Sequence, residues 1–364
     1  MQILAWAVAL FFAINIGASG TAASMGSAYG AGAVKRRWIA LVLVAVAVFL
    51  GAYLGGGDVV KTISGGIIPS HLITLGLTVV IITAAGSTLF LANLLSVPLS
   101  TSEVTVGSLV GVGLAYQTLF LGKLFFLLAV WLVFPFLSYG IAFLLGKVVR
   151  PTEAKLANLR PQRTITAILT FFLIAAGCYE AFSAGMNNVA NAVGPLVAAG
   201  VVHVNQGLFL GALFVALGAI ALGGRVLETN AKKITKISLL QGTVVSLTSG
   251  TLVIASSVFG LPVPLTQATT MAIMGVGSAK MGRGLWKQGI VKRVVLIWFT
   301  SPVSSLVISY LLVRIFVKTD IYSVVAIFSA FAMVVGFVLF LRGNRRAKAA
   351  HPEAATPSKP SSAK

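Results

Sequence analysis

The chain has 364 residues, of which 58% are hydrophobic and only 9% are charged, and its formal net charge is +20. Soluble domains carry about 25% charged residues because their surface faces water, so this composition and a mean hydropathy of +1.00 exclude a soluble globule. The basic residues lie in short connectors between apolar stretches, which argues against a nucleic-acid-binding protein.

Apolar stretches long enough to cross ~30 Å of hydrocarbon, which takes about 20 helical residues, recur along the chain. We expect spanning helices at residues 38–54, 72–93, 123–147, 206–222, 237–259, 289–312 and 321–341. Further apolar stretches are interrupted by Gly, Pro, Ser, Thr and Asn, at residues 1–34, 95–115, 164–202 and 262–279. The sequence thus predicts an all-α polytopic membrane protein with about 11 crossings and broken or re-entrant helices. Unbroken apolar runs argue against a β-barrel, whose strands alternate polar and apolar residues.

The basic residues fall in alternate connectors, around residues 35–37, 147–163, 225–236, 280–293 and 342–348, whereas residues 55–70 and 201–207 are nearly bare. Connectors on the cytoplasmic side carry such an excess of Lys and Arg. We therefore expect a multi-pass protein of the cell membrane, surrounded by lipid, with its N-terminus outside and its C-terminus in the cytoplasm. The Ala/Pro/Ser/Lys-rich tail, residues 343–364, is expected to be disordered.

Two glycine-bounded motifs divide the chain into halves. Gly17–Gly26 and Gly185–Gly194 are separated by a constant offset of 168 residues (185 − 17 and 194 − 26). Each half continues to a second polar stretch, Pro98–Gly107 in the first and Pro262–Thr270 in the second. The sequence predicts a first repeat at residues 1–147, a basic cytoplasmic linker at 148–163 and a second repeat at 164–342.

The basic connectors indicate that the two halves have opposite orientations. The segment after the first motif is basic, with Lys35–Arg37, while its counterpart at residues 201–207 is not. In the next pair of connectors the difference is reversed, since residues 55–70 are nearly bare and residues 225–236 are basic. Inverted repeats with interrupted helices at matching positions are typical of secondary transporters, which bind substrate near the middle of the membrane.

The interrupted stretches offer uncharged hydrogen-bonding groups and helix N-termini, which favour anions. Small and hydroxyl residues can instead serve close helix packing, but their pairing across two halves favours a binding site. The predicted substrate-binding residues are Ser19, Gly20, Thr21, Ser100, Thr101, Ser102, Asn187, Asn188, Asn191, Thr266 and Gln267.

At these residues the chain resembles the PiT family of inorganic phosphate transporters, whose members carry two Gly-Ala-Asn-Asp-Val-Ala-Asn-Ala-type motifs, each followed by a Pro-Val-Ser-Thr-type motif. Gly185–Gly194 is similar to the first motif, and Pro98–Ser102 is similar to the second. Pro262 and Val263, followed by Thr266 and Gln267, match in part. The resemblance covers almost all of residues 1–341 and implies transport of an inorganic anion, and it also makes a homodimer plausible.

The departures from the family pattern bear on the substrate. The family's Asp falls on Gly20 in the first motif and on Asn188 in the second, so both motif carboxylates are missing. An ionised carboxylate only accepts hydrogen bonds, so it suits an anion that still carries a proton, such as hydrogen phosphate. Without it, a fully deprotonated dianion fits better. We expect sulfate import, as in the sulfate permeases that resemble this pattern, with inorganic phosphate as the alternative.

The two remaining carboxylates at membrane depth are Glu103, inside the first Pro-x-Ser-Thr-Ser motif, and Glu180, just before Gly185. Ionisable groups in membrane segments are rare and usually functional, and burial favours the neutral, protonated form of a carboxyl group. We expect proton symport, with Glu103 as first candidate. Glu180 can alternatively be a structural partner in a helix contact. Sodium coupling is weakened by the loss of the motif Asp residues but is not excluded.

Other classes of protein fit less well. An intramembrane enzyme needs a catalytic set such as an Asp dyad or His/Glu metal ligands, and neither Asp58 nor Asp320 falls within a predicted span. We therefore expect no enzymatic activity, no cofactor and no metal site. An anion channel would share the interrupted polar segments, but paired halves and buried Glu residues favour coupled transport.

Overall fold

The computed structural model describes residues 1–94, 99–158, 163–228, 237–282 and 290–320, together with Tyr322 and Val325. All regular elements in these residues are helical, and eight of the helices are long and apolar enough to cross a membrane. The all-α polytopic prediction is therefore confirmed. The helices are α1 (Gln2–Ile16), α2 (Gly26–Gly30), α3 (Arg37–Gly55), α4 (Gly57–Gly65), α5 (Leu75–Leu94), α6 (Thr101–Tyr116), α7 (Leu121–Asn158), α8 (Arg163–Ala198), α9 (Val204–Leu222), α11 (Leu239–Val258), α12 (Leu265–Met281) and α13 (Ile290–Leu312), with shorter turns η1 (Gly17–Thr21), η2 (Ser70–Leu72) and η4 (Val313–Val317).

Six of the seven predicted uninterrupted spans coincide with α3, α5, α7, α9, α11 and α13 within a few residues, apart from α7, which continues to Asn158 through the first part of the predicted basic linker. The seventh, at residues 321–341, lies outside the described residues, as does the predicted disordered tail at 343–364. The described chain divides into a body of residues 1–313 and a part that starts at Arg314. In that second part, Arg314 and Asp320 form an ion pair of 3.1 Å.

Three of the four interrupted stretches contain the expected break in the helix. After α1 the chain forms a π-helical turn, η1, in which Ser19 departs from helical geometry (φ −100°, ψ −115°). α6 follows extended backbone at Ser100, and α12 begins directly after Pro264.

The fourth prediction, a break within residues 164–202, is wrong: α8 is one helix of 36 residues through the whole second motif. The glycines of this motif serve packing. A Cβ on Gly185 would lie 2.1 Å from Val48 O, and a Cβ on Gly194 would lie 2.4 Å from Ile63 Cγ2. The missing side chains let α3 and α4 approach the backbone of α8 closely.

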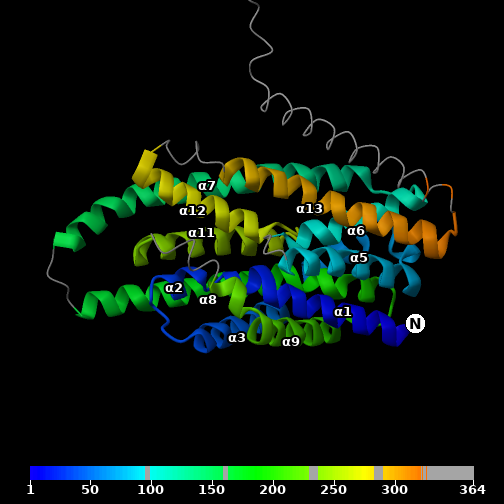
Figure 1. The fold of residues 1–364 in the computed structure, drawn as a ribbon, viewed down its shortest axis with the longest axis horizontal. Coiled ribbons are helices and arrows are strands. Elements are labelled where there is room, and N and C mark those ends of the chain that lie inside the picture. Colours follow the sequence, from blue (N-terminus) through cyan, green and yellow to red (C-terminus); the bar gives the residue numbers. More distant parts are fainter. Residues whose placement is uncertain are drawn as a thin grey trace, which may run out of the picture. The chain divides into compact units, whose positions relative to one another are not determined.

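The helices pack in a pattern that repeats between the two parts of the chain (Figure 1). α1 packs on α5 and α9, while α8 packs on α11 and α3. α6 packs on α5 and α13, while α12 packs on α11 and α7. Exchanging α1 with α8, α3 with α9, α5 with α11, α6 with α12 and α7 with α13 therefore converts these pairs of neighbours into one another.

Close glycine contacts follow the same exchange. A Cβ on Gly17 would lie 1.9 Å from Val215 O of α9, and one on Gly185 would lie 2.1 Å from Val48 O of α3. Both pairs keep nearly the same spacing along the chain, 168 residues (185 − 17) and 167 residues (215 − 48). Direct backbone contact between helices thus occurs at equivalent places in both parts.

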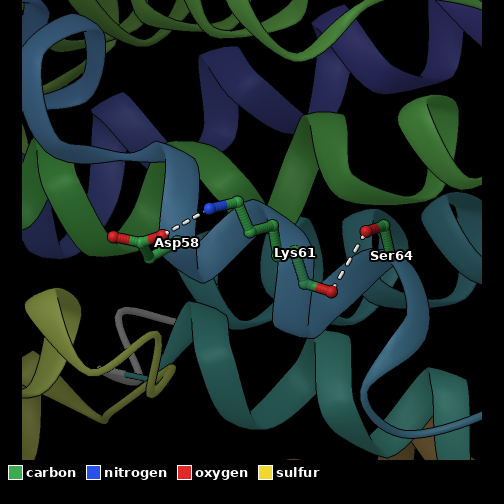
Figure 2. A network of polar contacts seen from close by, with 3 residues as sticks. All are labelled: Asp58, Lys61 and Ser64. Carbon is green, nitrogen blue, oxygen red and sulfur yellow. Dashed lines mark hydrogen bonds and ion pairs between the residues drawn. The ribbon is translucent and has the colours of Figure 1, made fainter.

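The connector at residues 55–70, which carries few basic residues, contains the short helix α4. Figure 2 shows its exposed side, where Lys61 Nζ lies 2.8 Å from Asp58 Oδ1 and Ser64 Oγ donates to Lys61 O at 3.1 Å. The other side of α4 buries Val59, Val60 and Ile63 against the body. Asp58 thus faces solvent, as expected for an acidic residue of a connector.

Candidate functional site

The start of α6 lies against the middle of α8. Ser100 precedes α6 in extended geometry, and its Oγ accepts a hydrogen bond from Glu103 N at 3.4 Å, which caps the helix. The other backbone N–H groups of a first helical turn have no partner within the helix. Together with the helix dipole they favour negative charge at this end.

Polar side chains of α8 meet this helix start in the buried interior. Thr101 Oγ1 donates to Asn188 Oδ1 at 2.8 Å, and Asn191 Nδ2 reaches Thr101 Oγ1 at 3.4 Å and Ser102 Oγ at 3.3 Å. All four residues are at most 5% exposed. The structure therefore brings together four predicted site residues that are separated by about ninety positions in the chain.

Asn187 has a different role in the geometry, because all of its hydrogen-bonding capacity is used within the protein. Its Oδ1 accepts from Ser102 Oγ at 3.2 Å and from Val263 N at 3.0 Å. Its Nδ2 donates to Ser257 Oγ and to Leu261 O, both at 2.9 Å. Asn187 thus fixes the segment between α11 and α12 against α8, and has no donor left for an anion.

The first motif lies beside the start of α12. A Cβ on Gly20 would lie 3.2 Å from Thr266 Oγ1, so the π-helical turn approaches the first turn of α12. Thr21 Oγ1 is buried without a hydrogen-bond partner, while Ser19 Oγ donates to Ile16 O at 3.4 Å. The arrangement corresponds to that of α8 and α6. In both cases the motif of one half lies beside the first turn of a helix from the other half.

Glu103 and Gln267 join the two helix starts. Each is the third residue of its helix, α6 and α12 respectively, and they are 2% and 4% exposed. The Gln267 amide nitrogen donates to Glu103 Oε1. Residues that are equivalent under the exchange of halves therefore contact each other, which places this pair where the two halves meet.

Glu180, the second predicted coupling residue, lies outside this group. It is 1% exposed and accepts hydrogen bonds from Ser249 Oγ at 2.9 Å and Thr269 Oγ1 at 2.6 Å. Sequence reasoning missed Ser249, Thr269 and Ser257. A signal was present, since Ser246, Ser249 and Ser257 interrupt the apolar sequence of α11 at helical spacing.

Chemically, the site offers neutral donors at two helix starts. The Thr21 hydroxyl and the Asn188 amide nitrogen donate to no other described residue. Asn191 Oδ1 is buried without a partner and can only accept. The buried ionisable residues among those described are the acids Glu103 and Glu180. In the described parts of the chain, no group of three or more His, Cys, Asp or Glu residues is arranged to hold a metal ion.

The phosphate transporter family matches residues 16–309, a stretch that includes both motifs and both helix starts. The chain belongs to this family. It is 51% identical to the sulfate permease CysP of Bacillus subtilis over 346 residues, which is 95% of this chain and 97% of the relative.

More distant family members carry phosphate names. The chain is 28% identical to a putative phosphate permease of Pyrococcus abyssi, over 82% of this chain and 94% of the relative. A solved sodium-dependent phosphate transporter superposes with a TM-score of 0.72 at 25% identity, over 85% of this chain and 98% of the transporter. These similarities support the membrane-transporter fold and the predicted family.

Proposed function

We propose that this protein is a secondary transporter that imports sulfate. The observation that carries the proposal is the pair of buried helix starts lined with neutral donors, at which Gly20 and Asn188 stand in place of the family's carboxylates. A tetrahedral anion between α6 and α12 would receive the first-turn backbone N–H groups that have no acceptor among the described residues, those of Thr101, Ser102 and Thr266. The similarity to a sulfate permease at 51% identity supports the same reading.

The selectivity follows from the donors and acceptors at the site. An Asp at position 188 would only accept hydrogen bonds, so it would repel sulfate and favour an anion that keeps a proton. An amide can donate from Nδ2 while its Oδ1 stays bonded to Thr101. A buried site whose donors and acceptors match one substrate strongly rejects an analogue with a different set of donors and acceptors, because some buried groups are then left without a hydrogen bond.

We propose proton symport, with Glu103 as the proton-binding residue at the anion site. Its carboxylate is buried beside the start of α6, and the described partner of its Oε1 is the neutral Gln267. An ionised Glu103 next to a dianion is unfavourable, so entry of sulfate and binding of a proton favour each other. This is the linkage that symport requires.

The architecture supports an inverted repeat, with residues 1–147 and 164–342 as its halves and 148–163 as the linker. The exchange of neighbours between α1–α7 and α8–α13 and the matching glycine contacts are what such a repeat would produce. We further propose about 11 crossings of the cell membrane with the N-terminus outside, as the basic connectors indicate, and assembly as a homodimer.

The test is radiolabelled sulfate uptake into proteoliposomes under an inward proton gradient, with unlabelled phosphate as competitor. We expect accumulation that resists phosphate and collapses with a protonophore. Uptake of phosphate in place of sulfate would show that loss of the motif Asp residues does not set selectivity. Flux that never accumulates anion against its gradient would indicate a channel.

A matched variant tests the coupling residue. Glu103→Gln keeps the shape of the side chain but cannot bind and release a proton. We expect sulfate exchange across the membrane without a pH gradient to persist and uptake driven by the gradient to fall. Full gradient-driven uptake by this variant would contradict the role of Glu103.

A further inference from the structure

Glu180 is a buried acid that the anion site does not use. It precedes Asn187 by seven residues in α8, which corresponds to about 10 Å along the helix axis. Glu180 is 1% exposed. Among the described ionisable residues, only Glu180 and Glu103 are buried. A permanently ionised carboxylate without a counter-charge would be costly there, so its surroundings must also accommodate a neutral form.

The hydrogen bonds around Glu180 have this property. Thr269 Oγ1 lies 2.6 Å from Glu180 Oε1 and 3.1 Å from Leu265 O. Ser249 Oγ lies 2.9 Å from Glu180 Oε1 and 2.9 Å from Val245 O. Ser249 Oγ also lies 3.4 Å from Ser246 O. Each hydroxyl thus has one proton to donate and at least one backbone acceptor within reach besides Glu180.

Both charge states of Glu180 are therefore satisfied by rotating two hydroxyl groups. When the carboxylate is ionised, Ser249 and Thr269 donate to it. When it takes up a proton, each hydroxyl can turn to the carbonyl one turn earlier in its own helix. The backbone does not need to move to change the charge of Glu180.

The charged groups nearby have other partners or lie elsewhere on their helices. α11, which carries Ser249, has no titratable residue, and α12 has only Lys280 near its far end. Arg37 of α3 pairs with Glu228, Lys61 pairs with Asp58 on α4, and Tyr179 bonds to Thr251. The remaining titratable residues on α8 and on the elements packed against it are Tyr29, Tyr53, Glu103, Tyr116, Arg163 and Cys178. Among the described residues, the hydrogen bonds that Glu180 accepts come from neutral hydroxyls.

We propose that Glu180, held by Ser249 and Thr269, binds a second proton for each sulfate transported. The proposal rests on sulfate–proton symport with Glu103 as the first proton site. Sulfate carries two negative charges, so one proton on Glu103 and one on Glu180 make the transported load neutral. Ser249 and Thr269 are positioning residues that contact neither the anion nor the first proton.

The start of α12 links the second proton to the anion. Gln267, which bonds to Glu103, and Thr269, which bonds to Glu180, lie two residues apart on this helix. Proton uptake by Glu180 releases one of the contacts that hold the first turns of α12. The same turns form one side of the anion site.

The experiment measures the charge moved per sulfate. Full-length protein in proteoliposomes takes up labelled sulfate while valinomycin and potassium set the membrane potential, and a dye inside reports proton entry. For the unaltered protein we expect two protons per sulfate and a rate that does not depend on potential. For Glu180→Gln we expect one proton per sulfate and uptake that slows several-fold at inside-negative potential, with sulfate exchange retained.

A second set of variants tests the positioning residue Thr269. These variants can refute the proposal even if Glu180→Gln does not fold. Thr269→Val removes a donor to the ionised carboxylate, so its uptake should persist to a pH about one unit higher. Thr269→Ser should behave as the unaltered protein, and Thr270→Val is a matched control because Thr270 bonds only to Thr266 O, at 2.7 Å, in the described structure.

The outcomes distinguish sulfate transport itself from the second proton site. Absence of sulfate uptake by the unaltered protein would refute the proposed function itself. Sulfate uptake by Glu180→Gln that remains independent of potential would refute the second proton site alone. Identical pH profiles for Thr269→Val and Thr269→Ser would refute the positioning role of Thr269.

Discussion

Replacing Asn187 by Ala tests whether this residue holds the site together or binds the anion. The change removes four hydrogen bonds. Two of the partners have alternatives, since Ser257 Oγ reaches Val253 O at 2.8 Å and Ser102 Oγ reaches Val263 O at 3.2 Å.

The other two partners, Val263 N and Leu261 O, are backbone groups and lose their only described partner in this network. A buried polar group left unpaired costs about 1–3 kcal/mol, so the variant should lose about 2–6 kcal/mol. At roughly 2 °C per kcal/mol for a chain of this size, the apparent Tm should fall by about 4–12 °C.

The assay is thermal unfolding of the purified protein in detergent, alongside sulfate uptake, with Asn188→Ala as the matched variant. Among the described residues Asn188 makes one hydrogen bond, which it accepts from Thr101. Replacing Asn188 should therefore raise the KM for sulfate with little change in Tm. An Asn187→Ala variant that keeps its Tm but loses affinity for sulfate would refute the reasoning, because Asn187 would then be a direct ligand.

Three further predictions concern selectivity, packing and surface charge. Asn188→Asp should let phosphate compete with sulfate at about tenfold lower concentration, an effect of about 1.4 kcal/mol, measured by inhibition of uptake; unchanged competition would contradict the acceptor argument. Gly185→Ala should abolish the yield of folded protein, because its Cβ would lie 2.1 Å from Val48 O, whereas Gly122→Ala meets nothing within 4 Å and should be neutral in the same expression assay. Arg37→Ala removes an exposed ion pair with Glu228 and should change stability by less than about 1 kcal/mol; a larger drop in Tm would show that the pair is part of a more important contact.

The sequence predicted the elements of this fold well because hydrophobic length alone decides whether a helix can span a membrane. The boundaries of α3, α9 and α13 follow directly from their apolar runs. The interpretation of glycines was less reliable. Gly17 belongs to a real break at η1, but Gly185, at the equivalent position, lies within an unbroken helix. A glycine pattern does not distinguish a break from a close contact, since both need a missing side chain.

The candidate site was predicted in part for a similar reason. The motifs identified Thr101, Asn188 and Asn191, which the structure brings into contact. The sequence could not show that Asn187 is fully bonded, because its partners Leu261 and Val263 are backbone groups in a segment more than seventy residues away. Nor could it identify Thr269, whose importance depends on which helix faces Glu180.

The exchanged packing of the last helices has a consequence for synthesis. α6 packs against α13, which begins 189 residues after α6 does (290 − 101), so the start of α6 at the candidate site is synthesised long before the helix that covers it. Contacts this distant in the chain form late, and partly made chains expose surfaces that the finished protein hides. In a ribosome-bound chain that ends after α12, α6 should therefore be packed less stably than in the complete protein. Assembly of the described helices in the bilayer should finish only after α13 has been inserted.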